Sequence, residues 1–389
     1  MRRLACLVLA VMTALLLALP AQAALPETAA ATRAANWMAA QQDTTGAFPG
    51  GGLDAVLALA AAGQPVASMS HGGSTAAAWL QGQAPTAVKK AGTLAKLILA
   101  VRAAGLDPRA FAGQDLVAAL EAFYDPATGA YAAGDIFGDS LAIVALKATG
   151  QSLGAKALDY LRAAQDSRGA WAYDGSADPN NGDTNTTSIA VQALAAAGVT
   201  SGDSALQKAV AYLASVQNTD GGFPYQSPSQ YGTDSDANST AYVIQGLLAA
   251  GQDPEGATWT KGGHNPVQRL LAFQNQDGAL RYQDSAADDN MLATAQAVPA
   301  LLGKTMLQAS QPTTPQPTPT ATPSATPSAT PSATPAGTPP ATPPVVAPPN
   351  TGSGPAGGSS GVALAALGLA ALALLGAAAV RRSARGGRG

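Results

Sequence analysis

The sequence is poor in the residues on which thiol and metal chemistry depends. Its 389 residues include one cysteine, Cys6, and two histidines, His71 and His264. Cys6 lies in the apolar N-terminal segment, so a product that loses this segment can form no disulfide, cysteine-ligated zinc site or cysteine nucleophile. The histidines lie far apart in glycine-containing loops. We therefore expect no metal site.

Charged and aromatic side chains are also scarce. Asp, Glu, Lys and Arg make up 12% of the residues and the formal net charge is -3, so the chain lacks the basic surface that binds a phosphate backbone. We expect no nucleic-acid partner. Aromatic residues contribute 5% although 47% of the residues are hydrophobic. The apolar residues are therefore mainly Ala and Leu, which favour helices, and we predict an all-α protein.

The N-terminal segment has the order of a secretory signal peptide. Arg2 and Arg3 precede an apolar run over 4–19, and small residues at 21 and 23 suit cleavage after Ala23. The predicted signal peptide is 1–23, and we expect the rest of the chain to be secreted.

The C-terminal part is typical of a protein tethered to a cell surface. Residues 308–347 are rich in Pro, Thr, Ala and Ser, a composition that forms no buried core and predicts a disordered linker or stalk. Within 348–389, an apolar run over 362–380 is long enough to be a transmembrane helix, and a basic tail follows it.

The residues before this run carry a further motif. Pro349, Asn350, Thr351 and Gly352 precede the apolar run, and this order resembles the cell-wall sorting signal of sortase substrates, which has Leu-Pro-x-Thr-Gly, an apolar helix and a basic tail. Here Pro348 stands in place of the Leu. The resemblance implies sortase as a partner, whereas the apolar run alone predicts anchoring in the membrane. Both predict a secreted protein held at the cell wall or membrane.

One pattern recurs through residues 28–305. An Ala- and Leu-rich segment ends in Gln, a Gly follows four residues later, and an aromatic residue usually follows two residues after that. The copies begin at Gln42, Gln165, Gln217 and Gln274. Helix-capping residues and terminal glycines bound the segments between them, which predicts about twelve helices in six pairs.

Six helix pairs can form an open solenoid or a closed ring. Small residues on the second helix of each pair, such as Ala190, Ala241 and Gly246, favour tight convergence about an axis. We therefore predict a closed (α/α)6 toroid.

These repeats resemble the squalene cyclase-like repeats of the terpenoid cyclase and protein prenyltransferase superfamily, which also contains the cobalamin carriers intrinsic factor and transcobalamin. The resemblance covers residues 28–305. It implies an α/α toroid and leaves open whether the protein is an enzyme or a carrier.

The catalytic motifs of that superfamily are missing. Squalene-type cyclases use Asp-x-Asp-Asp-Thr-Ala as a proton donor, whereas the matching stretch here runs from Asp236 through Asn238 to Thr240 and keeps one of the three carboxylates, with Asp234 just upstream. The zinc ligands of the prenyltransferases cannot be assembled without cysteine. The sequence therefore favours a protein without catalysis.

The polar and aromatic residues of the repeats are the candidates for ligand contact. We expect them at one end of the ring, where the second helices begin and form a polar mouth. The aromatic candidates are Trp171, Tyr173, Phe223, Tyr225, Tyr231 and Tyr282. The polar candidates are Asp183, Asn185, Thr187, Asp234, Asp236, Asn238 and Thr240, with Gln192 and Gln245 expected to line the bore. A structural role is the alternative for each, because such residues also join and cap helices.

The leading hypothesis is a monomeric, cell-surface-anchored toroid that binds a small ligand without catalysis. The ligand candidates are a cobalamin-like molecule, which the resemblance implies, and a glycan. Two alternatives stay open: an extracellular terpenoid cyclase-like or polysaccharide-active enzyme using rim carboxylates, and an adhesion or envelope module without a small ligand.

We expect no cofactor, and no calcium in the Asp- and Asn-rich loop over 174–183, because Pro179 stands where an EF-hand has Gly.

Overall fold

The computed structural model of the protein describes residues 26–230 and 232–312. The expected signal peptide, the sorting signal with its apolar run and nearly all of the linker lie outside these residues. No helix within the described ranges is long and apolar enough to cross a membrane.

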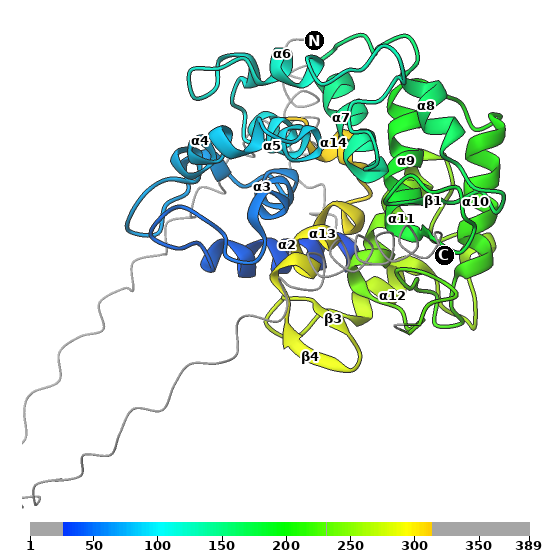
Figure 1. The fold of residues 1–389 in the computed structure, drawn as a ribbon. Coiled ribbons are helices and arrows are strands. Elements are labelled where there is room, and N and C mark those ends of the chain that lie inside the picture. Colours follow the sequence, from blue (N-terminus) through cyan, green and yellow to red (C-terminus); the bar gives the residue numbers. More distant parts are fainter. Residues whose placement is uncertain (1–25, 231, 313–389) are drawn as a thin grey trace, which may run out of the picture. The chain divides into compact units, whose positions relative to one another are not determined.

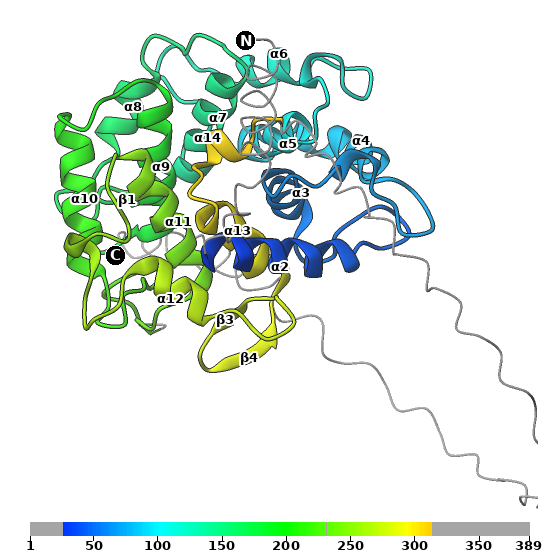
Figure 2. The same ribbon diagram turned by 180° about the vertical axis from the view of Figure 1, so that it is seen from behind.

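Helices dominate this body and follow one another in six pairs (Figure 1). The first helices of the pairs are α2 (Pro26–Ala40), α4 (Ala76–Ala87), α6 (Leu116–Glu121), α8 (Ala157–Ala163), α10 (Ser204–Val216) and α12 (Pro266–Ala272). The second helices are α3 (Gly52–Ala61), α5 (Ala91–Ala103), α7 (Ile136–Ala148), α9 (Thr184–Ala196), α11 (Ala237–Ala249) and α13 (Met291–Leu301). Helices α4, α6, α8 and α10 lie at the edge of the body in both Figure 1 and Figure 2.

The second helices form a closed ring. Each contacts the next, from α3 to α5, α7, α9, α11 and α13, and α13 contacts α3 in turn. Three short 3-10 helices, η1 (Val66–Ser68), η2 (Pro108–Ala110) and η3 (Ala257–Trp259), lie in the connections. The predicted helical α/α toroid is therefore confirmed for the described residues.

Small residues let the second helices approach closely. A Cβ added at Gly92 of α5 would lie 2.7 Å from the Cα of Gly138 on α7, and one added at Gly246 of α11 would lie 3.0 Å from the Cβ of Ser188 on α9. Both distances are too short for a larger residue without movement of the backbone. The Ala- and Gly-rich composition thus sets the tightness of the ring.

The second helices also begin at residues that the sequence marks. Asp135, Asp183, Asp236 and Asn290 each accept a hydrogen bond from a backbone N–H of the first turn of α7, α9, α11 and α13, respectively. These contacts satisfy backbone donors that have no partner inside a helix. The start of each of these helices is therefore fixed locally.

The repeated Gln residues join neighbouring pairs. Nε2 of Gln217 donates to the carbonyl oxygens of Gly221 (2.9 Å) and Trp259 (2.7 Å), so one side chain holds its own loop and the next outer segment. Gln42, Gln165 and Gln274 each make the same two kinds of bond. These side chains have a structural role.

The last pair closes on the first through the same contacts. Nε2 of Gln274 donates to the carbonyl oxygen of Ala30 on α2 at 2.9 Å, and the Arg33 side chain donates to Oε1 of Gln274. Gly278 has φ +105°, and a Cβ there would lie 2.7 Å from the carbonyl oxygen of Arg33. The ends of the described chain thus meet as neighbouring repeats do.

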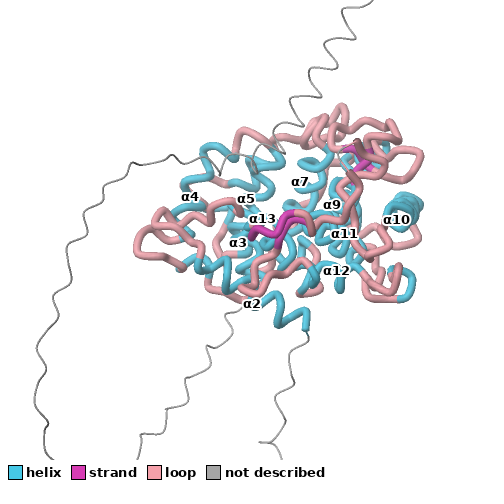
Figure 3. The backbone as a smooth tube through the Cα atoms, turned by 90° about the horizontal axis from the view of Figure 1, so that it is seen from below, coloured by secondary structure: helices cyan, strands magenta, loops and turns pink. Residues whose placement is uncertain are grey.

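Two short hairpins lie in loops where the all-α prediction had no strand (Figure 3). β1 (Trp171–Ala172) pairs antiparallel with β2 (Gly182–Asp183), and β3 (Arg281–Gln283) pairs antiparallel with β4 (Ala286–Asp289). Each hairpin directly precedes a second helix. The loops at the starts of α9 and α13 are therefore held by backbone hydrogen bonds.

An additional helix, α14 (Met306–Ala309), closes one end of the ring and was not predicted. It contacts α3, α7 and α9, and the backbone N–H of Met306 donates to Oε1 of the buried Gln192 at 2.7 Å. Nζ of Lys304 donates to the carbonyl oxygen of Ala61, the last residue of α3, at 2.7 Å. This end is therefore the one at which the second helices end.

Candidate functional site

The opposite end of the ring, where α7, α9 and α11 begin, is called the mouth below. The loops before α9 and α11 are each tied to the start of the preceding second helix. The carbonyl oxygen of Tyr173 accepts from the N–H of Ile136 on α7, and that of Tyr225 accepts from the N–H of Thr184 on α9, both at 2.9 Å. The loops and the helix starts therefore gather at one end.

Four of the predicted site residues are fully buried at this end. The N–H of Trp171 donates to Oγ1 of Thr187 at 3.0 Å, and the N–H of Phe223 donates to Oγ1 of Thr240 at 3.1 Å. The indole N–H of Trp171 also donates to the carbonyl oxygen of Leu161. A ligand at the mouth cannot reach these side chains, which fasten each loop to its own second helix.

The two predicted carboxylates of the helix starts are also buried. Oδ1 of Asp183 accepts from the N–H of Thr186 and Oδ1 of Asp236 from the N–H of Ser239, each at 2.7 Å. Only 1% of either residue is exposed. Burial raises the pKa of Asp183 to about 7 and that of Asp236 to about 6, because a low-dielectric surrounding disfavours the charged form.

The tyrosines of the loops reach the surface. Tyr173 is 42% exposed and Tyr282 is 37% exposed, and these are the exposed large hydrophobic side chains of the part that the structure describes. Tyr225 is half-buried, and its hydroxyl group interacts with the carboxyl group of Asp183. Burial raises the pKa of Tyr282 to about 12, so the hydroxyl group stays protonated.

These tyrosines form a connected arc, which we define as Tyr173, Tyr225 and Tyr282. The carbonyl oxygens of Tyr173 and Tyr225 accept from the first residues of α7 and α9, and strand β3, which contains Tyr282, contacts α11. The backbone N–H of Tyr225 in turn lowers the pKa of Asp236 against the larger effect of its burial. The arc therefore runs over the starts of α7, α9 and α11.

The other predicted polar residues lie around the arc. Asn185 and Asn238 are half-buried in the first turns of α9 and α11, and Nδ2 of Asn238 donates to Oε1 of Gln296 on α13 at 2.7 Å. Asp234 is exposed. Tyr231 lies outside the described residues.

The floor of the mouth is a group of side chains that was not predicted. Nζ of Lys96 on α5 lies 3.0 and 2.9 Å from the carboxylate oxygens of Asp54 on α3, and 6.0 Å from the centre of the Phe137 ring on α7. The hydroxyl group of Tyr242 on α11 lies near enough to Lys96 to affect the pKa of Lys96, and the Tyr242 ring packs edge-on against Phe137, with ring centroids 5.6 Å apart. Side chains from α5 and α11 thus meet across the ring.

The predicted bore residues lie deeper. Gln192 and Gln245 follow Asn185 and Asn238 by two helical turns and are 3% and 1% exposed. Gln192 bonds to α14, and Nε2 of Gln245 approaches the carbonyl oxygen of Gln296 at 3.5 Å. Helix α14 therefore covers Gln192 at the end where the second helices end.

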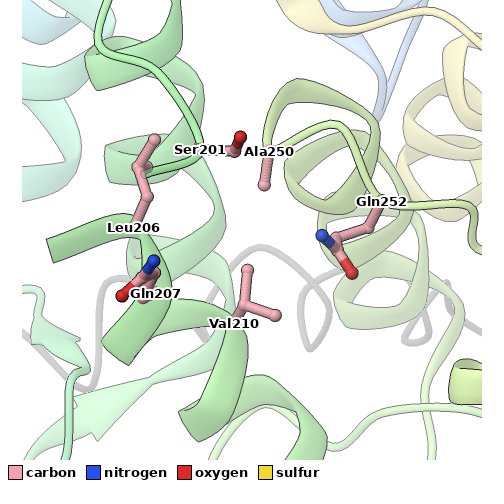
Figure 4. Close-up of a pocket in the computed structure, with 6 residues that line it drawn as sticks. All are labelled: Ser201, Leu206, Gln207, Val210, Ala250 and Gln252. Atoms are coloured by element: carbon pink, nitrogen blue, oxygen red, sulfur yellow. The ribbon is translucent and has the colours of Figure 1, made fainter. Parts of the chain in front are cut away.

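The depressions at the other end of the ring are shallow. One of about 160 Å³ lies between α10 and the segments after α9 and α11, and no charged side chain lines it (Figure 4). A second of about 250 Å³ lies between 63–68 and 103–105, at the ends of α3 and α5. Neither is lined by an aromatic side chain.

The buried carboxyl groups predict a pH-dependent stability. Besides Asp183 and Asp236, burial raises the pKa of Asp139 to about 6. In the unfolded chain these groups titrate near their ordinary value of about 3.9. Between about pH 4 and pH 7 the folded state therefore binds more protons, and we expect their contribution to the free energy of unfolding to fall as the pH rises through this window.

Urea denaturation at pH 4.5, 6 and 8 measures this dependence. Asp183→Asn keeps an oxygen that caps Thr186 but removes the titration, so the same series should be less steep in that variant. A free energy of unfolding that rises with pH in the unmutated protein, with an unchanged slope in Asp183→Asn, would contradict the prediction.

The mouth lies within a segment that matches a known family. Residues 115–289, which contain the whole arc, match the model of the squalene-hopene cyclase C-terminal domain. The fold is that of the α/α-toroid superfamily. No curated protein matches this chain in sequence.

Two kinds of solved structure are similar to this chain. A wild-type glycosidase is 15% identical, with 71% of this chain and 95% of the glycosidase covered at a TM-score of 0.50. The type II terpene cyclase MstE from Scytonema is 18% identical, with 71% of this chain and 97% of the cyclase covered at a TM-score of 0.46. The likeness to the glycosidase shows a common fold and leaves the activity of the toroid to its own residues.

The floor residues carried a signal in the sequence. Asp54 is the single charged residue of α3, and Lys96 is the single charged residue among the first ten of α5. The other residues of both segments are apolar or small. A lone charge on a buried helix requires a partner. The partner could not be named, because 42 residues separate the two.

Proposed function

We propose that this protein is a surface-displayed binding module that holds a polyhydroxylated ligand, a glycan, at the mouth of the toroid without catalysing a reaction. The observation that supports this best is the arc of Tyr173, Tyr225 and Tyr282, in which two large aromatic side chains stay exposed on an otherwise well-packed ring. Secretion and anchoring are part of the proposal and rest on the sequence of the two ends.

The chemistry of the mouth suits sugars. A tyrosine ring offers a flat apolar face together with a hydroxyl group, and sugar rings present C–H faces and hydroxyl groups in the same way. The half-buried amides of Asn185 and Asn238 add donors and acceptors. The floor pairs Lys96 with Asp54, so its charges are compensated and a neutral ligand is favoured.

Binding without catalysis agrees with how the carboxylates are used. Asp183 and Asp236 cap helices and are almost fully buried, and Asp54 is paired with Lys96. At least one oxygen of each of these three carboxyl groups therefore has a structural partner, and Oδ2 of Asp183 is buried without a hydrogen bond. A general acid or base must instead lie within hydrogen-bond reach of the reacting atom.

Glycan binding can be tested with the purified protein on an array of immobilised glycans, followed by calorimetry. We expect binding that the double variant Tyr173→Ala/Tyr282→Ala reduces by about 10-fold or more, since each aromatic contact contributes about 0.5–1.5 kcal/mol. Tyr160→Ala, on outer helix α8, is the control for a loss of packing, since Tyr160 is half-buried and its hydroxyl oxygen accepts from the N–H of Gly134 at 3.3 Å. The proposal fails if the array shows no binding, or if the double variant binds as the unmutated protein does.

Binding of cobalamin is tested with the same purified protein. The protein is mixed with cobalamin and desalted, and the visible absorbance of the retained cobalamin is measured. Absorbance that the protein retains and that Asp236→Ala/Asn238→Ala loses would show that the ligand is a corrinoid and not a glycan. We expect no retained absorbance, because Lys96 and Tyr242 meet across the ring and leave the floor closed.

A second candidate function is catalysis by Asp183. Its carboxyl group has a pKa of about 7 and interacts with the hydroxyl group of Tyr225, and a group that titrates near neutral pH can act as a general acid. Hydrolysis of chromogenic glycosides by the protein, lost in Asp183→Asn while glycan binding persists, would favour an enzyme.

A further inference from the structure

The tyrosines of the arc hold one position in three consecutive repeats. Each lies two residues after the buried residue of its loop: Tyr173 follows Trp171, Tyr225 follows Phe223, and Tyr282 follows Leu280. The same position holds Gly50 after Phe48 and Ala133 after Tyr131. The aromatic groups therefore occupy one side of the ring, over α7, α9 and α11.

The geometry of the ring spaces these tyrosines evenly. Tyr173 and Tyr225 are fixed by their carbonyl oxygens to the first residues of α7 and α9, and strand β3, which contains Tyr282, contacts α11. Neighbouring packed helices lie about 8–10 Å apart. We therefore expect the backbones of successive tyrosines to lie at about that spacing, which is comparable to the disaccharide repeat of an extended β-1,4-linked sugar chain.

The loops that carry the first two tyrosines are joined to each other. Nη1 of Arg168 donates to the carbonyl oxygen of Pro179 (3.1 Å) and Nη2 to that of Ser227 (3.0 Å). Nε2 of Gln226 donates to the carbonyl oxygen of Asn180 at 2.6 Å. These bonds hold the two loops in a fixed relation before a ligand arrives, which lowers the entropic cost of binding.

The floor favours a ligand that lies across the mouth over one that enters the ring. Lys96 from one side of the ring and Tyr242 from the other side are in contact, and Asn238 is bonded to Gln296 beside them. The exposed aromatic surface is on the rim, at Tyr173 and Tyr282. An extended chain can contact all three tyrosines, whereas a single sugar can contact one.

We infer that the arc is a set of three successive subsites for an extended β-1,4-linked glycan, with Tyr225 at the centre and Tyr173 and Tyr282 at the ends. This inference rests on the proposed function and names the ligand class for the same mouth. It also assigns a path to the bound glycan, which runs along the starts of α7, α9 and α11.

Calorimetry with two series of β-1,4-linked oligomers, of glucose and of N-acetylglucosamine, each from one to six sugars, tests the inference. We expect affinity for at least one series to rise about 10-fold or more between the disaccharide and the hexasaccharide. Tyr173→Ala and Tyr282→Ala should each lower the affinity for the hexasaccharide by about 2- to 10-fold while leaving that for the disaccharide nearly unchanged. Tyr225→Phe keeps the central ring and is expected to retain the dependence on length.

The outcomes separate this inference from the proposed function. Equal affinity for the disaccharide and the hexasaccharide, or binding of other glycans on the array but of neither series, would overturn the arc of subsites and leave glycan binding standing. No binding of any glycan would overturn both. Tyr160→Ala and the thermal midpoint of each variant show that a loss of affinity does not come from unfolding.

Discussion

Gly278→Ala is expected to lower the free energy of unfolding by about 4 kcal/mol. The backbone at Gly278 has φ +105°, and an added Cβ would lie 2.7 Å from the carbonyl oxygen of Arg33 and 2.9 Å from its carbonyl carbon. A left-handed backbone conformation costs a side chain about 1–2 kcal/mol, and overpacking adds about 1–3 kcal/mol. Because Arg33 belongs to α2, the strain falls on the contact that closes the ring.

Urea denaturation measures this loss, and hydrogen exchange shows where it acts. We expect faster exchange in α2 (Pro26–Ala40) and α12 (Pro266–Ala272) than in helices on the far side of the ring. Gly263→Ala is the matched control, since it also has positive φ (+85°) but no heavy atom within 4 Å of an added Cβ. Equal destabilisation by the two substitutions would show that the ring is not tightly closed at Gly278.

Lys96→Met is expected to lower the free energy of unfolding by about 3 kcal/mol. The side chains of Lys96 and Asp54 are 18% and 13% exposed and lie 2.9 Å apart. Removing one partner leaves a carboxylate that is largely withdrawn from water without its ion pair, a change that costs about 3–5 kcal/mol when the pair is fully buried. The neighbouring Asp54 holds the pKa of Lys96 above its usual range, so Lys96 stays charged throughout the pH range in which proteins are usually studied.

The double variant Asp54→Leu/Lys96→Met is the control. Replacing both charges by apolar groups removes the unpaired carboxylate, so most of the stability lost in Lys96→Met should return. Denaturation of the two single variants and the double variant gives the coupling free energy. A double variant as unstable as the sum of the single variants would mean that the two groups do not interact across the mouth.

Residues that act on their own helix or loop could be assigned from the sequence. The starts of α9 and α11 were predicted because Asp183 and Asp236 precede apolar helical segments, and a cap acts within the next three residues. The repeated Gln was recognised because its bond to Gly221 spans only four residues. Local contacts of this kind leave a constant spacing that a sequence displays.

Residues whose roles depend on tertiary contacts could not be assigned in this way. Trp171 and Tyr173 are two positions apart in one loop and looked equally suited to a ligand, yet one is fully buried and the other is 42% exposed. Which of them faces solvent depends on where Thr187 places the backbone of Trp171. The same holds for Gln192, whose oxygen is used by α14, 114 residues further along the chain.

The sequence by itself determined the helices, their pairing and the repeat that joins them, because capping, glycine termination and the Gln contacts within each loop act over a few residues. Only the tertiary structure decided that the ring closes between Gly278 and Arg33, that Lys96 pairs with Asp54 and meets Tyr242, and that three tyrosines share one side of the mouth. These are contacts between residues far apart in the chain. Their partners become defined only when six helix pairs have converged on one axis.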